Sequence, residues 1–202
     1  MIRLPYVPRW TNWIFPQMEW QTGRREIALT FDDGPHPEIT PWVLNELAKR
    51  NMVATFFCVG ENVQRNNAVF ADLLNSGNAV GNHTHQHLRG TEVGVEEYIR
   101  DVETAAEFIS TKLFRPPYGR IAKSQVEKLV AQNYRIIMWE VLSYDFDANL
   151  SPDYCFKILS RYTREGSIVV FHDSEKAWPR LKSCLPKYLD WLVQNNHLTT
   201  LV

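Results

Sequence analysis

Two clusters of residue types that bind metal ions stand out along the chain. Residues 83–87 read His-Thr-His-Gln-His, and Asp32-Asp33 is a pair of adjacent carboxylates. A catalytic divalent metal commonly has three protein ligands and an open position for water. Histidines four residues apart share one face of a helical turn, whereas an extended segment would place His83, His85 and His87 together. We predict a metal site here and favour His83 with His87, because the preceding strand should turn into a loop or helix at this point.

The two aspartates allow a division of roles. At a strand-to-loop turn before Gly34-Pro35, both carboxylates can reach one cavity. One could ligate the metal while the other accepts a proton from a water whose pKa a divalent metal lowers toward ~7. The alternative is that Asp-Asp-Gly-Pro forms a plain surface turn, which turn chemistry alone favours.

Three further segments carry residues suited to hydrolysis. Arg115 precedes two prolines that stiffen its backbone, so its guanidinium could orient a carboxylate. Tyr118-Gly119 could present a backbone N–H to a developing oxyanion. His172 follows an apolar run and could donate a proton to a leaving amine. The simpler interpretations are a surface arginine and a core histidine.

Short apolar runs alternate with amphipathic stretches from residue 26 onward, which predicts right-handed βαβ units and a parallel sheet. About seven parallel strands are too many for a small open sheet and too few for an eight-fold barrel, so we expect an α/β fold with a distorted or incomplete (β/α) barrel. The expected strands are 26–31, 53–59, 79–82, 114–118, 134–139, 167–171 and 198–202. The expected helices are 37–51, 61–76, 93–112, 124–132, 151–162 and 177–194, the last perturbed by Pro186.

The reactive segments come directly after five of these strands. Active sites of parallel α/β folds gather at the carboxyl ends of the strands, so we expect the five segments to meet at one rim. We expect the chain to lead from the strand at 134–139 to Asp145.

Composition bounds the remaining possibilities. The chain has 202 residues, 45% hydrophobic and 22% charged, with a formal net charge of −1, which suits one globular domain and gives no electrostatic support for nucleic-acid binding. Cys58, Cys155 and Cys184 show no disulfide or zinc-knuckle spacing.

Residues 1–25 are predicted to form an irregular N-terminal arm, and residues 26–202 the catalytic domain. We expect Trp10, Trp13 and Trp20 in the arm to serve packing rather than ligand binding. The sequence shows no transmembrane run and no signal-peptide pattern. We therefore expect a cytoplasmic protein if the chain is complete and an exported one if a leader has been removed.

Taken together, the segments resemble the five motifs of the NodB-homology polysaccharide deacetylases, carbohydrate esterase family four, in the family's order and over residues 26–202. The matching segments are Thr30-Phe31-Asp32-Asp33-Gly34-Pro35, His83-Thr84-His85-Gln86-His87, Arg115-Pro116-Pro117-Tyr118, Asp145-Phe146 and Val170-Phe171-His172. The resemblance implies that Asp32 is the general base, and that Asp33, His83 and His87 bind a divalent metal, most often zinc, with cobalt, nickel or manganese as alternatives.

The same resemblance assigns the other roles. It implies that Arg115 tethers the base, that the Tyr118 backbone helps form the oxyanion hole, and that His172 is the general acid. Asp145 would orient or tune a partner, either Arg115 or His172.

The sequence departs from the family at three apolar positions. Phe146 stands where tryptophan is usual, Val170 where leucine is usual, and Leu142 where many members have another aspartate. Phe146 and Val170 are expected to line the pocket for the acyl methyl group.

The implied activity is hydrolysis of the N-acetyl group of an N-acetylglucosamine-containing oligo- or polysaccharide, with release of acetate. A carbohydrate is therefore the expected partner, with no nucleic acid and no membrane span. Two alternatives stay open: a metal hydrolase of another amide or an O-acetyl ester, and a glycan-binding relic without catalysis.

Overall fold

A curled parallel sheet forms the centre of the protein, whose computed structural model describes residues 4–202. Within this range nine strands pair, in the order β1-β6-β5-β4-β3-β2-β8-β7, with β9 beside β2, and every named pair is parallel. The strands are β1 (Met18–Glu19), β2 (Ile27–Asp32), β3 (Thr55–Cys58), β4 (Ala79–Asn82), β5 (Leu113–Phe114), β6 (Arg135–Ile137), β7 (Val141–Leu142), β8 (Ile168–His172) and β9 (Thr199–Thr200).

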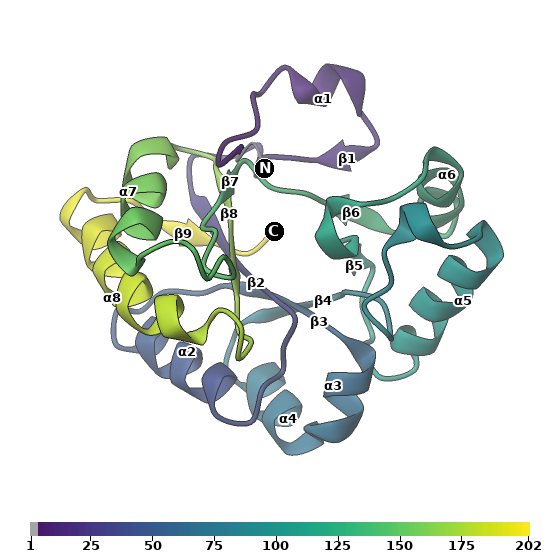
Figure 1. The fold of residues 1–202 in the computed structure, drawn as a ribbon, viewed down its shortest axis with the longest axis horizontal. Helices are drawn as coiled ribbons and strands as arrows, with labels where there is room; N and C mark the ends of the chain where they lie inside the picture. The colour runs from purple at the N-terminus through teal and green to yellow at the C-terminus, as the bar shows by residue number, and fades with distance from the viewer. Residues whose placement is uncertain (1–3) are drawn as a thin grey trace.

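The sheet curls because its two ends are joined by a very short connection. Only residues 138–140 separate β6 from β7, although these strands lie near opposite ends of the pairing order. Figure 1 shows the strands arranged around the middle of the molecule with the helices outside them. The predicted distorted barrel is thus confirmed. All seven predicted strands are present, and the two-residue strands β1 and β7 were not predicted.

Strand β2 shows how the sequence sorts its residues between the two faces of this sheet. Ile27, Leu29 and Phe31 alternate along the strand and belong to the large core that packs against the outer helices. Phe31 stacks on Phe56 at a ring distance of 5.0 Å. Asp32, two positions beyond Thr30, therefore faces the inside of the barrel at the carboxyl end of β2.

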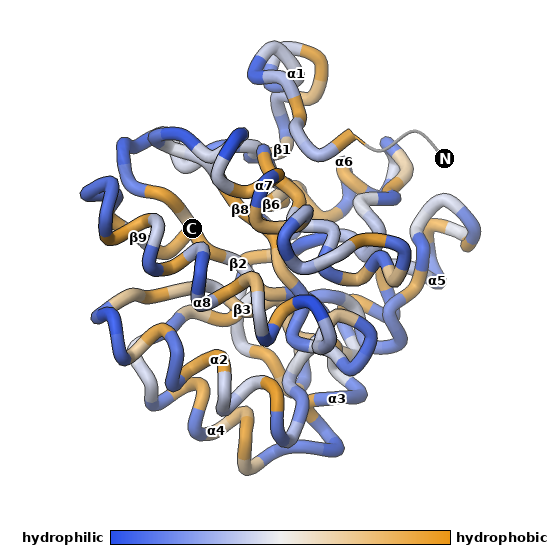
Figure 2. The backbone as a smooth tube through the Cα atoms, turned by 60° about the vertical axis from the view of Figure 1, so that its left-hand side comes forward, coloured by the Kyte–Doolittle hydropathy of each residue, from blue (hydrophilic) through white to orange (hydrophobic). Residues whose placement is uncertain are grey.

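The described chain has eight α-helices, of which α2 to α8 lie around the outside of the sheet (Figure 1) and bury apolar residues. Figure 2 shows that hydrophobic and hydrophilic residues alternate along these helices. The predicted helix at 61–76 is two helices, because Asn66 departs from helical backbone angles between them. Pro186 lies inside α8 without ending it. The helices are α1 (Thr11–Ile14), α2 (Ile39–Ala48), α3 (Gly60–Arg65), α4 (Asn67–Asn75), α5 (Val95–Ala106), α6 (Lys123–Ala131), α7 (Pro152–Tyr162) and α8 (Trp178–Gln194). None of the helices described is both long enough and apolar enough to cross a bilayer.

The N-terminal arm closes the seam of the barrel. Tyr6 forms an antiparallel bridge with Val141 of β7, and β1 pairs with β6 on the other side of the seam. Arg9 reaches the fully buried Glu140 between these strands, with Nε 2.8 Å from Oε1. The arm thus contacts both strands that flank the seam. The predicted domain boundary after residue 25 stays a prediction. Residues 1–3 of the predicted arm lie outside the described chain.

The tryptophans of the arm do not all pack. Trp20 is buried in the core beneath β6, as expected. Trp10 is 56% exposed and Trp13 is 87% exposed, so the packing expectation was wrong for these two. Trp13 lies in α1 and Trp10 directly precedes it, and this helix stands away from the rest of the molecule in both views (Figures 1 and 2).

Candidate active site

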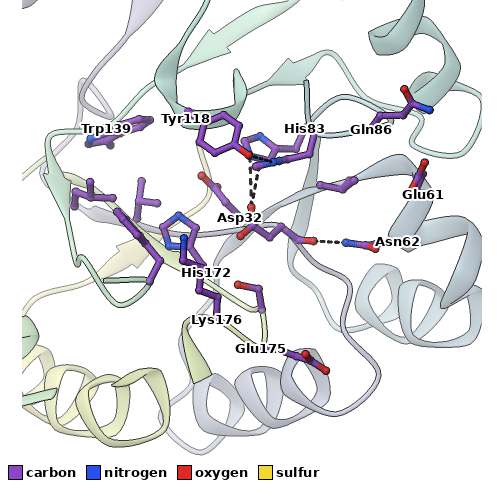
Figure 3. Close-up of a pocket in the computed structure, with 17 residues that line it drawn as sticks. Asp32, Glu61, Asn62, His83, Gln86, Tyr118, Trp139, His172, Glu175 and Lys176 are labelled. Atoms are coloured by element: carbon purple, nitrogen blue, oxygen red, sulfur yellow. Dashed lines mark hydrogen bonds and ion pairs between the residues drawn. The ribbon is translucent and has the colours of Figure 1, made fainter. Parts of the chain in front are cut away.

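One cavity of about 730 Å³ lies at the carboxyl ends of the strands, as the rule for parallel α/β folds predicts. Figure 3 shows its lining side chains converging from several loops. Eight of the ten predicted site residues line it, and the other two, Arg115 and Asp145, are buried directly behind it. The eight are Asp32, Asp33, His83, His87, Tyr118, Phe146, Val170 and His172.

Asp33, His83 and His87 form a compact group of possible metal ligands. His87 Nε2 lies 3.1 Å from Asp33 Oδ1, and His83 Nε2 lies 3.9 Å from the same oxygen. One ligand atom from each residue lies within 4.8 Å of the other two. A set of two imidazoles and one carboxylate beside an open cavity matches the ligand chemistry of a catalytic divalent metal.

The two histidines meet through a loop rather than a helical turn. Thr84 and His87 both have left-handed backbone angles, with φ of 64° and 57°. The Asn82 side chain accepts a hydrogen bond from the Thr84 N–H at 2.8 Å and so stabilises the bend. The assignment of His83 and His87 as ligands stays a prediction, and of the loop or helix expected after β4 the structure has a loop.

His85 points away from this group. Its ring stacks on Phe108 at 5.9 Å, and it lies directly against Gly60, where a Cβ would collide with its Nδ1. Among the described residues, that buried Nδ1 has no hydrogen-bond partner. The extended-strand alternative, with all three histidines on one face, is therefore excluded.

The hydrogen bonds of the two site imidazoles test whether they suit a metal. His83 Nδ1 lies 2.7 Å from the carbonyl oxygen of Arg115, and His87 Nδ1 lies 3.1 Å from the Tyr118 hydroxyl. Each Nε2 is therefore the atom that faces Asp33. Burial lowers the pKa of His83 to about 4, so this imidazole is neutral at pH 7 and retains a lone pair for a cation. The residues present fit a divalent metal.

Asp33 is held in an unusual backbone conformation. Its φ is +82°, a value that is rare for residues other than glycine. The Asn62 side chain donates to the Asp33 carbonyl at 2.7 Å, and Asp173 accepts from the next N–H, that of Gly34, at 3.1 Å. Burial would raise the pKa of the Asp33 carboxyl, but the hydrogen bond from His87 and the charge of His172 outweigh it and hold this pKa well below its usual range.

Asn62 and Asp173 had not been predicted as site residues. Asp173 is fully buried, and it accepts a further hydrogen bond from the Thr40 hydroxyl on α2. Burial raises the pKa of Asp173 to about 7. Adjacency to His172 was the single sequence signal for Asp173, and Asn62 gave none because its partner is a distant backbone carbonyl.

Arg115 is fully buried behind the cavity and fixes Asp32. Its Nη1 donates to Asp32 Oδ1 at 2.7 Å and to the Thr30 hydroxyl at 2.7 Å. The remaining guanidinium nitrogens donate to the carbonyl oxygens of Ile137 and Met138. With every nitrogen bonded, the guanidinium is fixed, and the carboxylate of Asp32 is fixed with it. The alternative of a surface arginine was wrong.

Asp145 pairs with His172 rather than with Arg115. Asp145 Oδ1 lies 2.7 Å from His172 Nδ1, and Oδ2 accepts the His172 backbone N–H at 2.9 Å. Burial alone would lower the pKa of His172, but the charge and hydrogen bond of Asp145 outweigh it and raise this pKa to about 9. The aspartate follows β7, not the predicted strand at 134–139, because the chain changes sheet partner at residues 138–140.

An apolar wall faces the metal-binding group across the cavity. Phe146 and Val170 belong to it as predicted, together with Leu142 and Trp139. The Phe146 ring packs edge-on against the His172 ring at 5.0 Å. Trp139 was not predicted, and its indole covers the turn at Gly119, where a Cβ would lie 2.6 Å from it.

Known proteins with similar sequences include enzymes that act on polysaccharides. A family model described as polysaccharide deacetylase matches residues 20–137. Two curated relatives from Bacillus cereus, both named peptidoglycan-N-acetylglucosamine deacetylase, are 33% identical over 158 residues and 31% identical over 186 residues. The first match covers 75% of this chain and 57% of the relative, and the second covers 88% and 87%. The chain thus spans little more than half the length of the first relative.

The fold is also shared with a solved structure. The crystal structure of the peptidoglycan N-acetylglucosamine deacetylase Bc1960, in complex with 4-naphthalen-1-yl-N-oxidanyl-benzamide, superposes with a TM-score of 0.88. It is 27% identical, and the match covers 98% of this chain and 95% of that one.

Proposed function

Because this chain belongs to the polysaccharide deacetylase family, we propose that it is a metal-dependent hydrolase that releases acetate from N-acetylglucosamine units of an oligo- or polysaccharide. The observation that carries this proposal is the convergence of three charged groups on one cavity. They are the metal-ligand set of Asp33 with two histidines, the Arg115–Asp32 pair and the Asp145–His172 pair. A protein that only binds glycans needs neither the ligand set nor the two pairs, and this cavity has all three.

Asp33, His83 and His87 would hold a single divalent cation, most often zinc for this ligand chemistry, with cobalt, nickel or manganese as alternatives. When bound, the cation would polarise the acetyl carbonyl and acidify the attacking water. The negative charge of ionised Asp33 and the neutral His83 suit this task.

Asp32 is proposed as the general base. It accepts the proton of the attacking water, and the Arg115 ion pair at 2.7 Å keeps its carboxylate in one orientation. A fixed base contributes to catalysis because little reorganisation is needed when the proton moves.

His172 is proposed as the general acid. With Nδ1 bonded to Asp145, its Nε2 is the nitrogen available to the substrate, and its raised pKa of about 9 keeps the ring protonated at neutral pH. It donates this proton to the departing sugar amine. The backbone N–H of Tyr118 is proposed to donate to the oxyanion, and Phe146 with Val170 to pack against the acetyl methyl group.

The test is acetate release from N-acetylated chito-oligosaccharides. We expect metal-stripped protein to be inactive and zinc to restore activity. The variant Asp32→Asn should lose at least ~100-fold in kcat, the usual contribution of a positioned base. Asp153→Asn, an exposed aspartate on α7 paired with Lys187, is the matched control and should retain full activity.

Two results would contradict the proposal. Near-wild-type acetate release by Asp32→Asn would remove the base assignment. Cleavage of O-acetylated sugars, with none of N-acetylated ones, would show that the substrate is an ester instead of an amide.

A further inference from the structure

Both candidate metal-binding imidazoles are oriented by one short segment, residues 115–118. His83 Nδ1 contacts the carbonyl oxygen of Arg115 at 2.7 Å, in the buried interior. His87 Nδ1 contacts the hydroxyl of Tyr118 at 3.1 Å, at the rim of the cavity, where Tyr118 is 56% exposed. The two imidazoles therefore have partners of different chemistry.

A backbone carbonyl can only accept a hydrogen bond. It therefore fixes His83 in the tautomer with a proton on Nδ1, which leaves the lone pair on Nε2 facing Asp33. This imidazole is ready for a cation whether or not one is bound.

A phenol hydroxyl can both donate and accept, so it suits either tautomer of His87. His87 Nε2 lies 3.1 Å from Asp33 Oδ1, so a neutral ring with its proton on Nε2 can donate to this carboxylate, and the Tyr118 O–H can then donate to Nδ1. To bind a cation through Nε2, His87 must carry its proton on Nδ1, and the Tyr118 oxygen must accept it. The same hydroxyl satisfies both arrangements.

We propose that Tyr118, through its hydroxyl, is a positioning residue for His87: it holds the ring in the metal-binding orientation and accepts the Nδ1 proton when Nε2 is free for a cation. The geometry supports this role. The Tyr118 ring packs edge-on against the His87 ring at 4.7 Å, and the Arg89 guanidinium covers the Tyr118 ring at 4.5 Å. Glu92 in turn holds Arg89 at 2.6 Å. This side-chain role is separate from the backbone role given to Tyr118 above, and it rests on the proposed metal site.

The test compares zinc binding by metal-stripped wild type and Tyr118→Phe, measured by titration calorimetry. Phenylalanine keeps the ring, its contacts and the backbone but removes the hydroxyl. We expect the dissociation constant for zinc to rise ~10-fold, the lower end of the effect of removing a hydrogen-bond partner of a metal-bound histidine. Tyr154→Phe, on α7 at 47% exposure, is the matched control and should bind zinc as the wild type does.

Nitrogen-15 NMR of the zinc-loaded imidazoles gives a second readout. We expect slowly exchanging Nδ1 protons on both His83 and His87 in the wild type. In Tyr118→Phe the His87 proton should exchange rapidly and disappear, while that of His83 persists as an internal control.

The outcomes separate this inference from the metal site itself. Unchanged zinc affinity in Tyr118→Phe, or a persistent His87 Nδ1 proton, would overturn the inference and leave the site standing. Failure of the wild type to bind zinc would overturn both. If Tyr118→Phe folds poorly, Arg89→Met tests the same arrangement by uncovering the ring, and an unchanged His87 proton exchange rate in this variant would also overturn the inference.

Discussion

Replacing Asp145 by asparagine would isolate the charge of the carboxylate that faces His172. The side chain of Asp145 is fully buried, and its oxygens accept both the imidazole Nδ1 proton and the backbone N–H of His172. Asparagine keeps the shape and one acceptor oxygen. The difference between Asp145→Asn and the wild type is therefore chiefly the stabilisation of protonated His172.

The magnitude follows from the pKa of His172, which rises from 6.5 to about 9 in the metal-free protein. This difference corresponds to ~3 kcal/mol, of which Asp145, the strongest of the groups that raise the pKa, supplies the larger part. Because the folded-state pKa is the higher one, the stabilisation is fully present below pH 6.5 and is lost as the pH rises through 9.

The assay is urea unfolding of metal-stripped protein at pH 6 and at pH 9.5, followed by the fluorescence of its seven tryptophans. At pH 6 we expect Asp145→Asn to be less stable than the wild type by ~2–3 kcal/mol, and at pH 9.5 the difference should vanish. The exposed pair of Asp153 and Lys187 is the control, and Asp153→Asn should change stability by under ~1 kcal/mol at either pH. Equal destabilisation of Asp145→Asn at both pH values would refute the reasoning.

Three further substitutions test other parts of the site. Arg115→Met leaves the Asp32 carboxylate buried without its ion pair. Urea titration should show that the free energy of unfolding falls by ~3–5 kcal/mol. A fall below ~1 kcal/mol would contradict the pairing. Gly34→Ala places a Cβ against the Asp173 carboxylate and so displaces the loop that carries Asp33. Calorimetry should then show zinc binding weakened ~10-fold or more. Unchanged binding would show that the loop adapts. His85→Leu should bind zinc within about twofold of the wild type, because this ring turns away from the ligands, and a tenfold loss would restore it as a ligand.

Much of the fold could be predicted because the apolar runs are long enough to show their period. Strand β2 is six residues long and entirely buried, and it places Asp32 at its carboxyl end. Parallel strands bring such ends together, so reactive residues after separate strands had to meet. Strand β1 lies in the proline-rich arm, and only residues 138–140 separate β7 from β6, so neither forms an apolar run of its own in the sequence. The element before Asp145 was missed because the sequence reads as one strand up to Trp139.

Residues that support the site from outside were harder to predict. Asn62 and Asp173 act on the loop at Asp33 through backbone groups that lie 29 and 139 positions away along the chain. Asp101 on α5 likewise accepts the backbone N–H of His85 at 2.8 Å. Polar residues of this kind look like ordinary helix-surface or turn residues until the packing of the loops is known. The exposure of Trp13 likewise depends on tertiary packing.

The arm that closes the barrel seam has a consequence for the order of folding during synthesis. Its contacts join Arg9 to Glu140, and Gln21 to Ser167, so they span 131 and 146 positions of the chain. Contacts of such high contact order form late, since the loop between them must close first. On the ribosome the arm emerges before the barrel strands it contacts, and both contacts can form only after Ser167 has been made. Until then the buried Glu140 lacks its Arg9 partner, and the nascent barrel presents an open seam to chaperones and to neighbouring chains.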